Sequence, residues 1–163
     1  MPDIRRFQPG DWPAVWSILE PVFRAGDTYA VDMEVSEEAA RKLWVTSPTA
    51  TFVFRDQGEI LGTYYIKPNH AGPGSHVCNC GYVVPPGARG RGIATAMCKH
   101  SQEEAVRLEF RAMQYNLVAS TNRGAVRLWE KLGFEKVGTL PGAFRHPHEG
   151  YVDAFVMFKQ LQK

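Results

Sequence analysis

The residues of this sequence best suited to chemistry form a turn rich in glycine and arginine. Residues 81–94, "GYVVPPGARGRGIA", pass from an apolar extended run through two prolines into a segment typical of a helix start. Gly90 and Gly92 carry no side chain that would hold an anion away from the backbone. Backbone N–H groups and the positive end of the helix dipole then point to one place, and Arg89 and Arg91 add charge. The turn indicates a phosphate or pyrophosphate site; the alternative is an ordinary connection whose arginines are solvated.

Two familiar phosphate-binding motifs do not fit this turn. The Walker A loop requires a Gly-Lys pair, and the chain has none. The Rossmann turn requires a third glycine, where this chain has Thr95, and an acidic residue after the next strand. That strand is expected to run into Val118-Ala119-Ser120, which contains no acid. Neither motif therefore explains the turn.

A third pattern fits, and a second motif downstream supports it. Residues 89–94, "RGRGIA", match the signature [RQ]-x-x-G-x-[GA]. Residues 122–134, "NRGAVRLWEKLGF", match N-x-x-A-x-x-[LF]-[YW]-x-x-x-G-F. Both motifs stand in the order, and on the strand–helix units, that are found in the GCN5-related N-acetyltransferase (GNAT) family. The chain resembles this family over nearly its whole length.

The resemblance implies that acetyl-CoA lies in a V-shaped gap between the extended run 76–84 and the strand 113–118. The pantetheine arm is then expected to pair, like an added strand, with the backbone of Gly81, Tyr82 and Val83. The amides expected to hold the pyrophosphate are those of Gly90, Arg91, Gly92, Ile93, Ala94 and Thr95. Arg89 is expected either to assist there or to pair structurally. Asn122 matches a side chain that hydrogen-bonds near the pantetheine; it is also a natural helix cap, and both roles are compatible.

The reaction that the family implies is direct attack of a neutral amine on the thioester carbonyl, without an acyl-enzyme. The oxyanion needs a donor already in place, and a backbone N–H in the Tyr82–Val83 region is the natural one. A base or a water relay removes a proton from the amine before attack. The candidate catalytic residues are Asn79 and Asn122.

Trp129 departs from the family pattern. Many relatives carry a tyrosine there that protonates the leaving thiolate, and an indole N–H is not a useful proton donor for this step. We therefore expect Trp129 to pack in the core. Tyr115 or Tyr151 could supply the proton instead, or the thiolate leaves unaided.

Two asparagines within expected strands point to the acceptor site. Asparagine is disfavoured inside strands, yet Asn79 and Asn116 each stand in the middle of one. Because these strands are expected to splay, we expect buried amides on both walls, binding polar groups of the substrate or a catalytic water. The alternative is a core amide satisfied by a neighbouring loop.

Three further stretches resemble the fungal acetyltransferases that act on the proline analogue azetidine-2-carboxylate: "HVCNCGYVV", "QYNLVASTN" and "GTLPGAFRHPHEGYVDAFVM". In those proteins, asparagines at the positions matching Asn79, Asn116 and Asn122 line the substrate site. The rest of the acceptor pocket is expected to come from Thr28, Tyr29, Tyr64 or Tyr65, and the loop Phe144–His146. An amino-acid carboxylate needs a cation, for which Arg145 is the nearest candidate; a solvated loop arginine is the alternative.

A metal site is not expected. His76, Cys78 and Cys80 alternate along one strand face, so neighbouring side chains start roughly 6.5–7 Å apart. A single zinc ion with bonds of about 2.3 Å could not be held by all three without a severe bend. The three cysteines also do not make a disulfide framework, because their number is odd. Small, partly buried thiols are the expected state.

The elements that must position these residues follow from periodicity and turn signals. Strands are predicted at residues 2–7, 51–55, 59–67, 76–84, 114–118, 136–139 and 151–158. Helices are predicted from Asp11 to Gly26, after Ser36, and at residues 93–110 and 125–132. This order predicts an α/β fold, and the resemblance implies one mixed, mostly antiparallel sheet with splayed central strands and flanking helices.

Composition sets the remaining limits. A chain of 163 residues fits one domain, residues 1–163. A net charge of +2 with interspersed signs argues against a nucleic-acid partner, and no apolar run is long enough for a membrane. The N-terminus lacks an apolar signal region, so a cytoplasmic location is expected. Members of the family often dimerise, so a homodimer is possible.

These observations predict an acetyl-CoA-dependent N-acetyltransferase that modifies a small molecule, either an amino acid or a toxic amino-acid analogue. The alternatives are a protein or peptide N-acetyltransferase and a non-catalytic module that binds acetyl-CoA.

Overall fold

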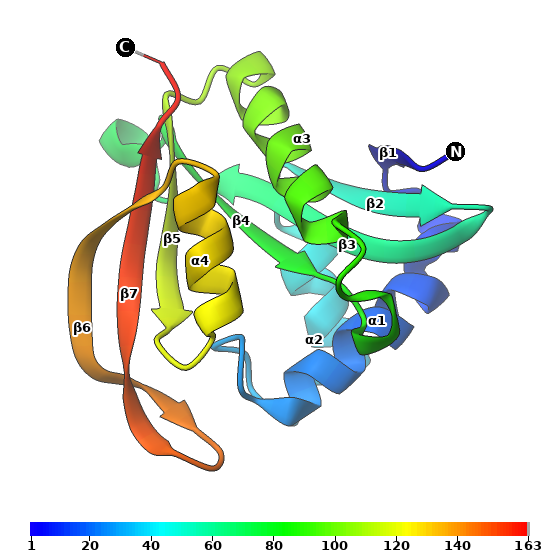
Figure 1. The fold of residues 1–163 in the computed structure, drawn as a ribbon. Helices are drawn as coiled ribbons and strands as arrows, with labels where there is room; N and C mark the ends of the chain where they lie inside the picture. The colour runs from blue at the N-terminus through cyan, green and yellow to red at the C-terminus, as the bar shows by residue number, and fades with distance from the viewer. Residues whose placement is uncertain (163) are drawn as a thin grey trace.

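The structure, a computed structural model, describes residues 1–162 and is built around a seven-stranded sheet (Figure 1). The strands are β1 (Asp3–Arg6), β2 (Ala50–Asp56), β3 (Glu59–Pro68), β4 (Val77–Val83), β5 (Ala112–Ala119), β6 (Glu135–His146) and β7 (Gly150–Gln160). Their order in the sheet is β1-β2-β3-β4-β5-β7-β6. The helices are α1 (Trp12–Ala25), α2 (Glu37–Arg41), α3 (Ile93–Arg107) and α4 (Arg123–Lys131). The expected mixed α/β sheet with flanking helices is confirmed.

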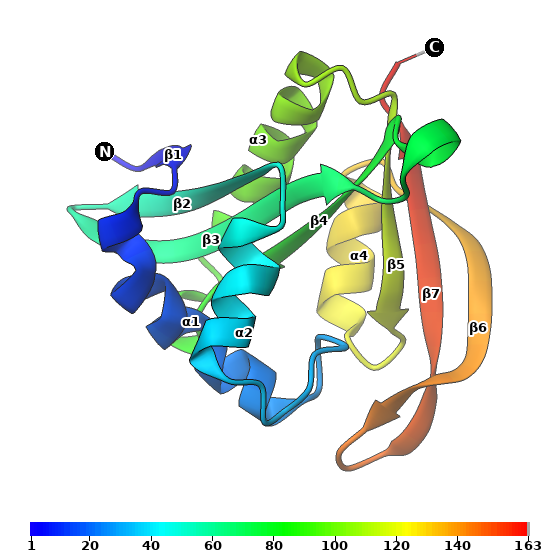
Figure 2. The ribbon, with the colours of Figure 1, turned by 180° about the vertical axis from the view of Figure 1, so that it is seen from behind.

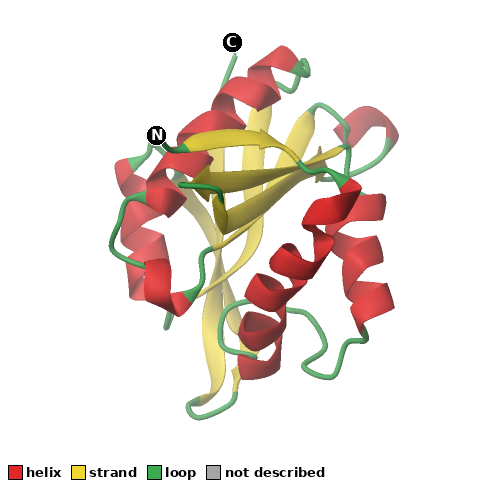
Figure 3. Ribbon diagram, turned by 90° about the vertical axis from the view of Figure 1, so that its right-hand side faces the viewer, coloured by secondary structure: helices red, strands yellow, loops and turns green. Residues whose placement is uncertain are grey.

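The helices cover both faces of the sheet. Helices α3 and α4 lie on one face, and α1 and α2 lie on the other, as the view from behind shows (Figure 2). The sheet is therefore the middle of three layers (Figure 3). Alternation along β4 sends Cys78, Cys80 and Tyr82 into the cluster under α3, and Val83 into the cluster under α1.

Local sequence explains where the helices begin and end. Apolar residues recur at helical spacing along α1, and Gly26, with φ of 67°, ends it in the left-handed conformation. The Ser36 hydroxyl caps α2 by accepting a hydrogen bond from the Ala39 N–H at 3.1 Å. Both caps were expected. A π-helical turn, Lys42–Thr46, continues α2 and was not expected.

The two central strands separate soon after they meet. Every other neighbouring pair is antiparallel, but β4 and β5 run parallel and pair only at Val77–Ala112 and Cys78–Met113. From Asn79 onward, no backbone pairing joins the two strands. The splayed central strands predicted from the sequence are therefore confirmed.

The last two strands are longer than expected. Residues 136–139 were predicted as a short strand and Phe144–His146 as part of a loop, but β6 extends through both. Two register shifts, between Lys136 and Gly138 and between Leu140 and Phe144, absorb the residues that interrupt the strand pattern. The hairpin of β6 and β7 projects beyond the helices (Figure 1).

The structure adds two findings about the chain as a whole. Among the residues that it describes, no helix is both long and apolar enough to cross a membrane. Cys78, Cys80 and Cys98 are free and buried. Burial raises the pKa of the Cys80 thiol well above its ordinary value.

Candidate active site

A cavity of about 800 Å³ opens where β4 and β5 separate. Its walls come from strand β5 and from parts of other elements. These parts are the loop after α1, the ends of β3, β4 and β6, and the starts of α3 and α4. A volume of this size suits a cofactor-sized ligand. The cavity therefore lies in the V-shaped gap that the sequence predicted.

Asn79 stands at the apex of the gap, buried and 8% exposed. Its Nδ2 donates a hydrogen bond of 2.9 Å to the backbone carbonyl of Gln114 on β5. Its Oδ1 accepts one of 3.0 Å from the Tyr65 hydroxyl. The amide thus joins the strands just beyond their last backbone pair, and it shares the cavity wall with Tyr65.

At Tyr82, the backbone N–H and carbonyl of β4 point into the gap and are bonded there by a side chain. The Tyr82 N–H donates to the Tyr29 hydroxyl at 2.7 Å, and the same hydroxyl donates to the Tyr82 carbonyl. Because hydrogen-bonding groups alternate along an antiparallel strand, those of Gly81 and Val83 face their partners on β3. Of the three residues expected to pair with pantetheine, Tyr82 is the one whose N–H and C=O point into the gap.

Gly81 leaves space for the ring of Tyr65. A Cβ atom at this position would lie 2.5 Å from Cε2 of Tyr65. The glycine therefore lets the Tyr65 ring pack against β4 and hold its hydroxyl near Asn79. The sequence did not indicate this role, because the two residues are brought together only by the register of β3 and β4.

The glycine turn has the geometry of an anion cradle. Gly90 and Gly92 adopt φ of 78° and 76°, and nothing lies within 4 Å of where their Cβ atoms would be. Gly92 caps α3 without a side-chain hydrogen bond, so the first N–H groups of the helix stay available. Arg89 lines the cavity, whereas Arg91 pairs with Asp56 at 3.4 Å.

Asn122 caps α4 and also lines the cavity. Its Oδ1 accepts a hydrogen bond of 3.3 Å from the Ala125 N–H. This confirms the helix-cap reading. The two roles considered from the sequence are compatible, because the cap uses Oδ1 and leaves the Nδ2 donors to a ligand.

Comparison with known proteins agrees with this geometry. The model of the acetyltransferase (GNAT) family matches residues 12–134. The chain belongs to the GNAT family of acetyltransferases. The enzyme class expected from the sequence, an acetyl-CoA-dependent N-acetyltransferase, is thereby confirmed.

Individual relatives support the assignment. The chain is 35% identical over 148 residues to the N-acetyltransferase aca1 of Schizosaccharomyces pombe, covering 80% of this chain and 71% of that protein. A GCN5-related N-acetyltransferase from Kribbella flavida has 41% identity and a TM-score of 0.93, covering 98% of this chain and 97% of that one. The acetyltransferase yncA from Salmonella typhimurium, a structure with its cofactor acetyl-CoA, has 20% identity and a TM-score of 0.84, covering 100% and 95%. This last likeness concerns the fold.

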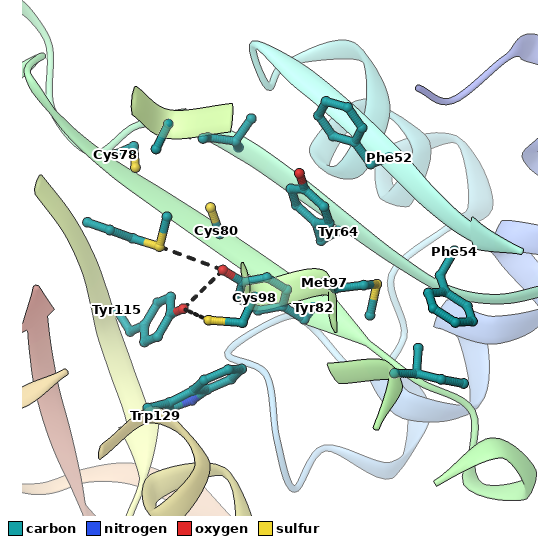
Figure 4. Packing of buried hydrophobic residues seen from close by; sticks show 14 of the residues in the cluster. Phe52, Phe54, Tyr64, Cys78, Cys80, Tyr82, Met97, Cys98, Tyr115 and Trp129 are labelled. Atoms are coloured by element: carbon teal, nitrogen blue, oxygen red, sulfur yellow. Dashed lines mark hydrogen bonds between the residues drawn. The ribbon is translucent and has the colours of Figure 1, made fainter. Parts of the chain in front are cut away.

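In this acetyltransferase, Trp129 is a packing residue, as expected. It is 9% exposed and lies against the rings of Tyr82 and Tyr115, at 5.2 and 4.9 Å between centroids (Figure 4). The Tyr115 hydroxyl meets the Tyr82 hydroxyl at 3.0 Å and the Cys98 thiol at 3.5 Å. Burial raises the pKa of Tyr115 well above its ordinary value, so this phenol keeps its proton.

The other tyrosine considered as a proton donor lies elsewhere. Tyr151 is 74% exposed on the β6–β7 hairpin. Within residues 1–162, it is not among those that line the cavity. Of the two tyrosines considered from the sequence, only Tyr115 lines the cavity in the described chain.

The acceptor side differs in part from expectation. Thr28 and Tyr29 line the cavity as predicted. Asn116 also lines it but is exposed, and its Nδ2 donates a hydrogen bond of 2.7 Å to Oδ1 of Asn69. The expectation of buried amides on both walls therefore holds for Asn79 alone.

Arg145 is exposed and lies outside the group of cavity-lining residues in the described chain. The structure therefore does not place Arg145 where it could face an acceptor carboxylate in the cavity. Residues 144–146 form a strand, so alternate side chains point to opposite sides, and His146 faces the cavity instead. Its Nδ1 accepts N–H bonds of 3.1 Å from His148 and Glu149, which leaves Nε2 to carry the proton.

Sequence reasoning also missed Lys67. This residue lines the cavity near the apex, opposite Asn79 in the β3–β4 register. Its ammonium lies over the Tyr65 ring, 5.4 Å from the centroid. Among residues 1–162 it forms no ion pair with an acidic side chain. A lone lysine near a strand end carries no sequence signal that would have found it.

Proposed function

We propose that this acetyltransferase moves the acetyl group of acetyl-CoA to the amine of a small amino acid or amino-acid analogue by direct attack. The observation that supports this most is Lys67, an unpaired cation beside the buried amide of Asn79 at the apex of the cavity. The carboxylate of an amino-acid acceptor would pair with Lys67, and its amine could donate to the second lone pair of Asn79 Oδ1.

The residues present fit acetyl-CoA as the donor. Gly90 and Gly92 leave open space at the start of α3, where a phosphate would meet free N–H groups and the helix dipole. Arg89 adds a cation to the same end of the cavity. Tyr82 and Asn122 offer backbone and amide groups farther in, where a pantetheine arm would pass. When bound, acetyl-CoA supplies an activated acetyl group.

The chain supplies the groups that this transfer needs. The Tyr82 N–H points into the gap and can donate to the carbonyl oxygen as negative charge develops there. Asn79 can orient the amine or a water that takes its proton. Tyr115, next to Trp129, is the one of the two tyrosines considered as proton donors that lines the cavity. No acid–base step is assigned to Trp129, because indole is not a useful donor.

The proposed acceptor is a small molecule rather than a protein chain. Tyr65, Asn79 and Lys67 line the cavity close together, so a hydroxyl, an amide and a cation are available to one compact zwitterion. Under this proposal, the resemblance to the fungal azetidine-2-carboxylate acetyltransferases suggests a cyclic imino acid as a test acceptor.

The test is an acceptor panel followed by thiol release from acetyl-CoA. The panel pairs each amino acid with the amine that lacks its carboxylate, and it adds azetidine-2-carboxylate, proline and short peptides. Turnover is expected for at least one carboxylate-bearing acceptor and not for its partner amine. Turnover of peptides alone would replace the proposal by peptide acetylation. Binding of acetyl-CoA with no turnover on any amine would leave a non-catalytic module.

A further inference from the structure

We infer that the Tyr29 hydroxyl, bonded to the edge of β4, occupies the position that a carbonyl of the acetyl donor takes when the donor binds. The donor must therefore displace this hydroxyl. The inference rests on the proposed function, since it assumes that acetyl-CoA enters the gap. It adds a residue that sets donor affinity, from a loop outside both sequence motifs of the family.

The hydrogen bonds of Tyr29 carry the inference. One hydroxyl accepts from the Tyr82 N–H at 2.7 Å and donates to the Tyr82 carbonyl. A paired strand would satisfy the same two groups with one N–H and one C=O. A hydroxyl is both donor and acceptor, so a single oxygen atom reproduces that pairing. At Tyr82, the edge of β4 is therefore hydrogen-bonded by a side chain of the same protein.

The position of the Tyr29 ring allows this contact to be exchanged. Its ring packs edge-on against Phe23 and Trp44, with centroids 6.2 and 6.1 Å away. These contacts hold the ring near the sheet, while the hydroxyl alone reaches β4. Residues 27–35 have no helix or strand, so a tilt of the ring does not break regular structure. Burial raises the pKa of Tyr29, so the phenol stays protonated and keeps donating.

Displacement has an energetic consequence. Two polar groups buried in the protein lose their partner unless the donor replaces it, and each unmade bond is costly. The donor therefore binds with an affinity reduced by what Tyr29 contributes. Removing the hydroxyl should make the empty protein less stable and the donor complex tighter.

The experiment compares Tyr29→Phe with wild type by calorimetric titration of acetyl-CoA. Tyr64→Phe is the matched control, because it removes a hydroxyl from the neighbouring strand outside the cavity, where Tyr64 bonds His100. A second titrant, adenosine 3′,5′-bisphosphate, has phosphates like those of CoA but no pantetheine arm. Tyr29→Leu serves as a second variant if Tyr29→Phe is poorly folded.

The expected result is a Kd for acetyl-CoA roughly three- to tenfold lower in Tyr29→Phe, with wild-type Kd for the bisphosphate. Acetyl-CoA should also raise the melting temperature of Tyr29→Phe by more than that of wild type. Unchanged or weaker acetyl-CoA binding in Tyr29→Phe, or an equal gain in Tyr64→Phe, overturns the inference. Failure of wild type to bind acetyl-CoA overturns the proposed function instead, so the two failures are distinct.

Discussion

The side-chain amide of Asn79 donates a hydrogen bond of 2.9 Å to the backbone carbonyl of Gln114, one residue beyond the last backbone pair of β4 and β5. The Asn79 side chain thus replaces the next backbone hydrogen bond between the two strands. The two walls of the cavity are fixed relative to each other at the position where the acceptor is proposed to bind.

Replacing this amide should cost both stability and activity. Asn79→Asp keeps the shape but sets a carboxylate against the Gln114 carbonyl, so we expect a loss of about 1–3 kcal/mol in the free energy of unfolding. Asn116→Asp, on an exposed side chain, should stay within about 0.5 kcal/mol of wild type. Urea denaturation measures both, and equal losses in the two variants would contradict the bridging role.

Gly81 should tolerate no side chain. In Gly81→Ala the new Cβ would stand 2.5 Å from the Tyr65 ring, so the ring must move and release Asn79. We expect a loss of roughly 1–3 kcal/mol on unfolding. Gly87→Ala is the control, because nothing lies within 4 Å of its Cβ position. A wild-type melting temperature for Gly81→Ala would show that Tyr65 does not need the glycine.

Trp129 should be replaceable by another ring but not by a small side chain. Trp129→Phe keeps much of the contact with Tyr82 and Tyr115, and steady-state kinetics should show most of the wild-type kcat. Trp129→Ala should lose about 3–5 kcal/mol of stability through the cavity it leaves. A collapse of kcat in a stably folded Trp129→Phe would mean that the indole takes part in the reaction.

Lys67 should distinguish acceptors by their carboxylate. With Lys67→Met we expect KM for an amino-acid acceptor to rise at least roughly tenfold, since a charge-assisted bond is lost. KM for the matching amine without a carboxylate should not change, and Lys67→Arg should recover part of the effect. Lys99→Met removes an exposed lysine on α3 and serves as control. Equal changes for both acceptors would rule out a carboxylate contact.

His100 should make stability depend on pH. Burial lowers its pKa below the ordinary 6.5, so between these two values the unfolded chain holds more protons than the folded one. Stability should therefore rise with pH across that window and fall on acidification below about 6.5. His100→Gln should flatten the curve of unfolding free energy against pH in this range. An identical curve would show that another group dominates.

The geometry of the glycine turn and of the α4 cap could be predicted because the signals for both are local. Gly90 and Gly92 stand next to the helix that they start, and a cap such as Asn122 acts within three residues. The same local logic placed Trp129 on a helix face that packs into the core.

The rest of the cavity wall depends on contacts between residues that are distant in the sequence. Tyr29 meets Tyr82 across 53 positions, and no motif marks either partner for the other. His146 faces the cavity in place of Arg145, because residues 144–146 belong to β6 and were expected to form a loop. In a strand, alternation decides which of two neighbouring side chains faces inward. Asn116 is exposed on the cavity wall and bonds to Asn69, 47 positions away, a pairing that no local pattern marks.

The burial of every cysteine has a practical consequence. Cys78, Cys80 and Cys98 are 0%, 6% and 0% exposed, so a reagent that titrates sulfhydryls meets no open thiol on the native chain. In an assay with acetyl-CoA and an acceptor, the colour of the reagent then measures the CoA thiol that is released, without background from the thiols of the enzyme. Without substrates, the rate at which the same reagent reacts reports the rate of global unfolding. The three cysteine thiols of the chain can react only after the core has opened.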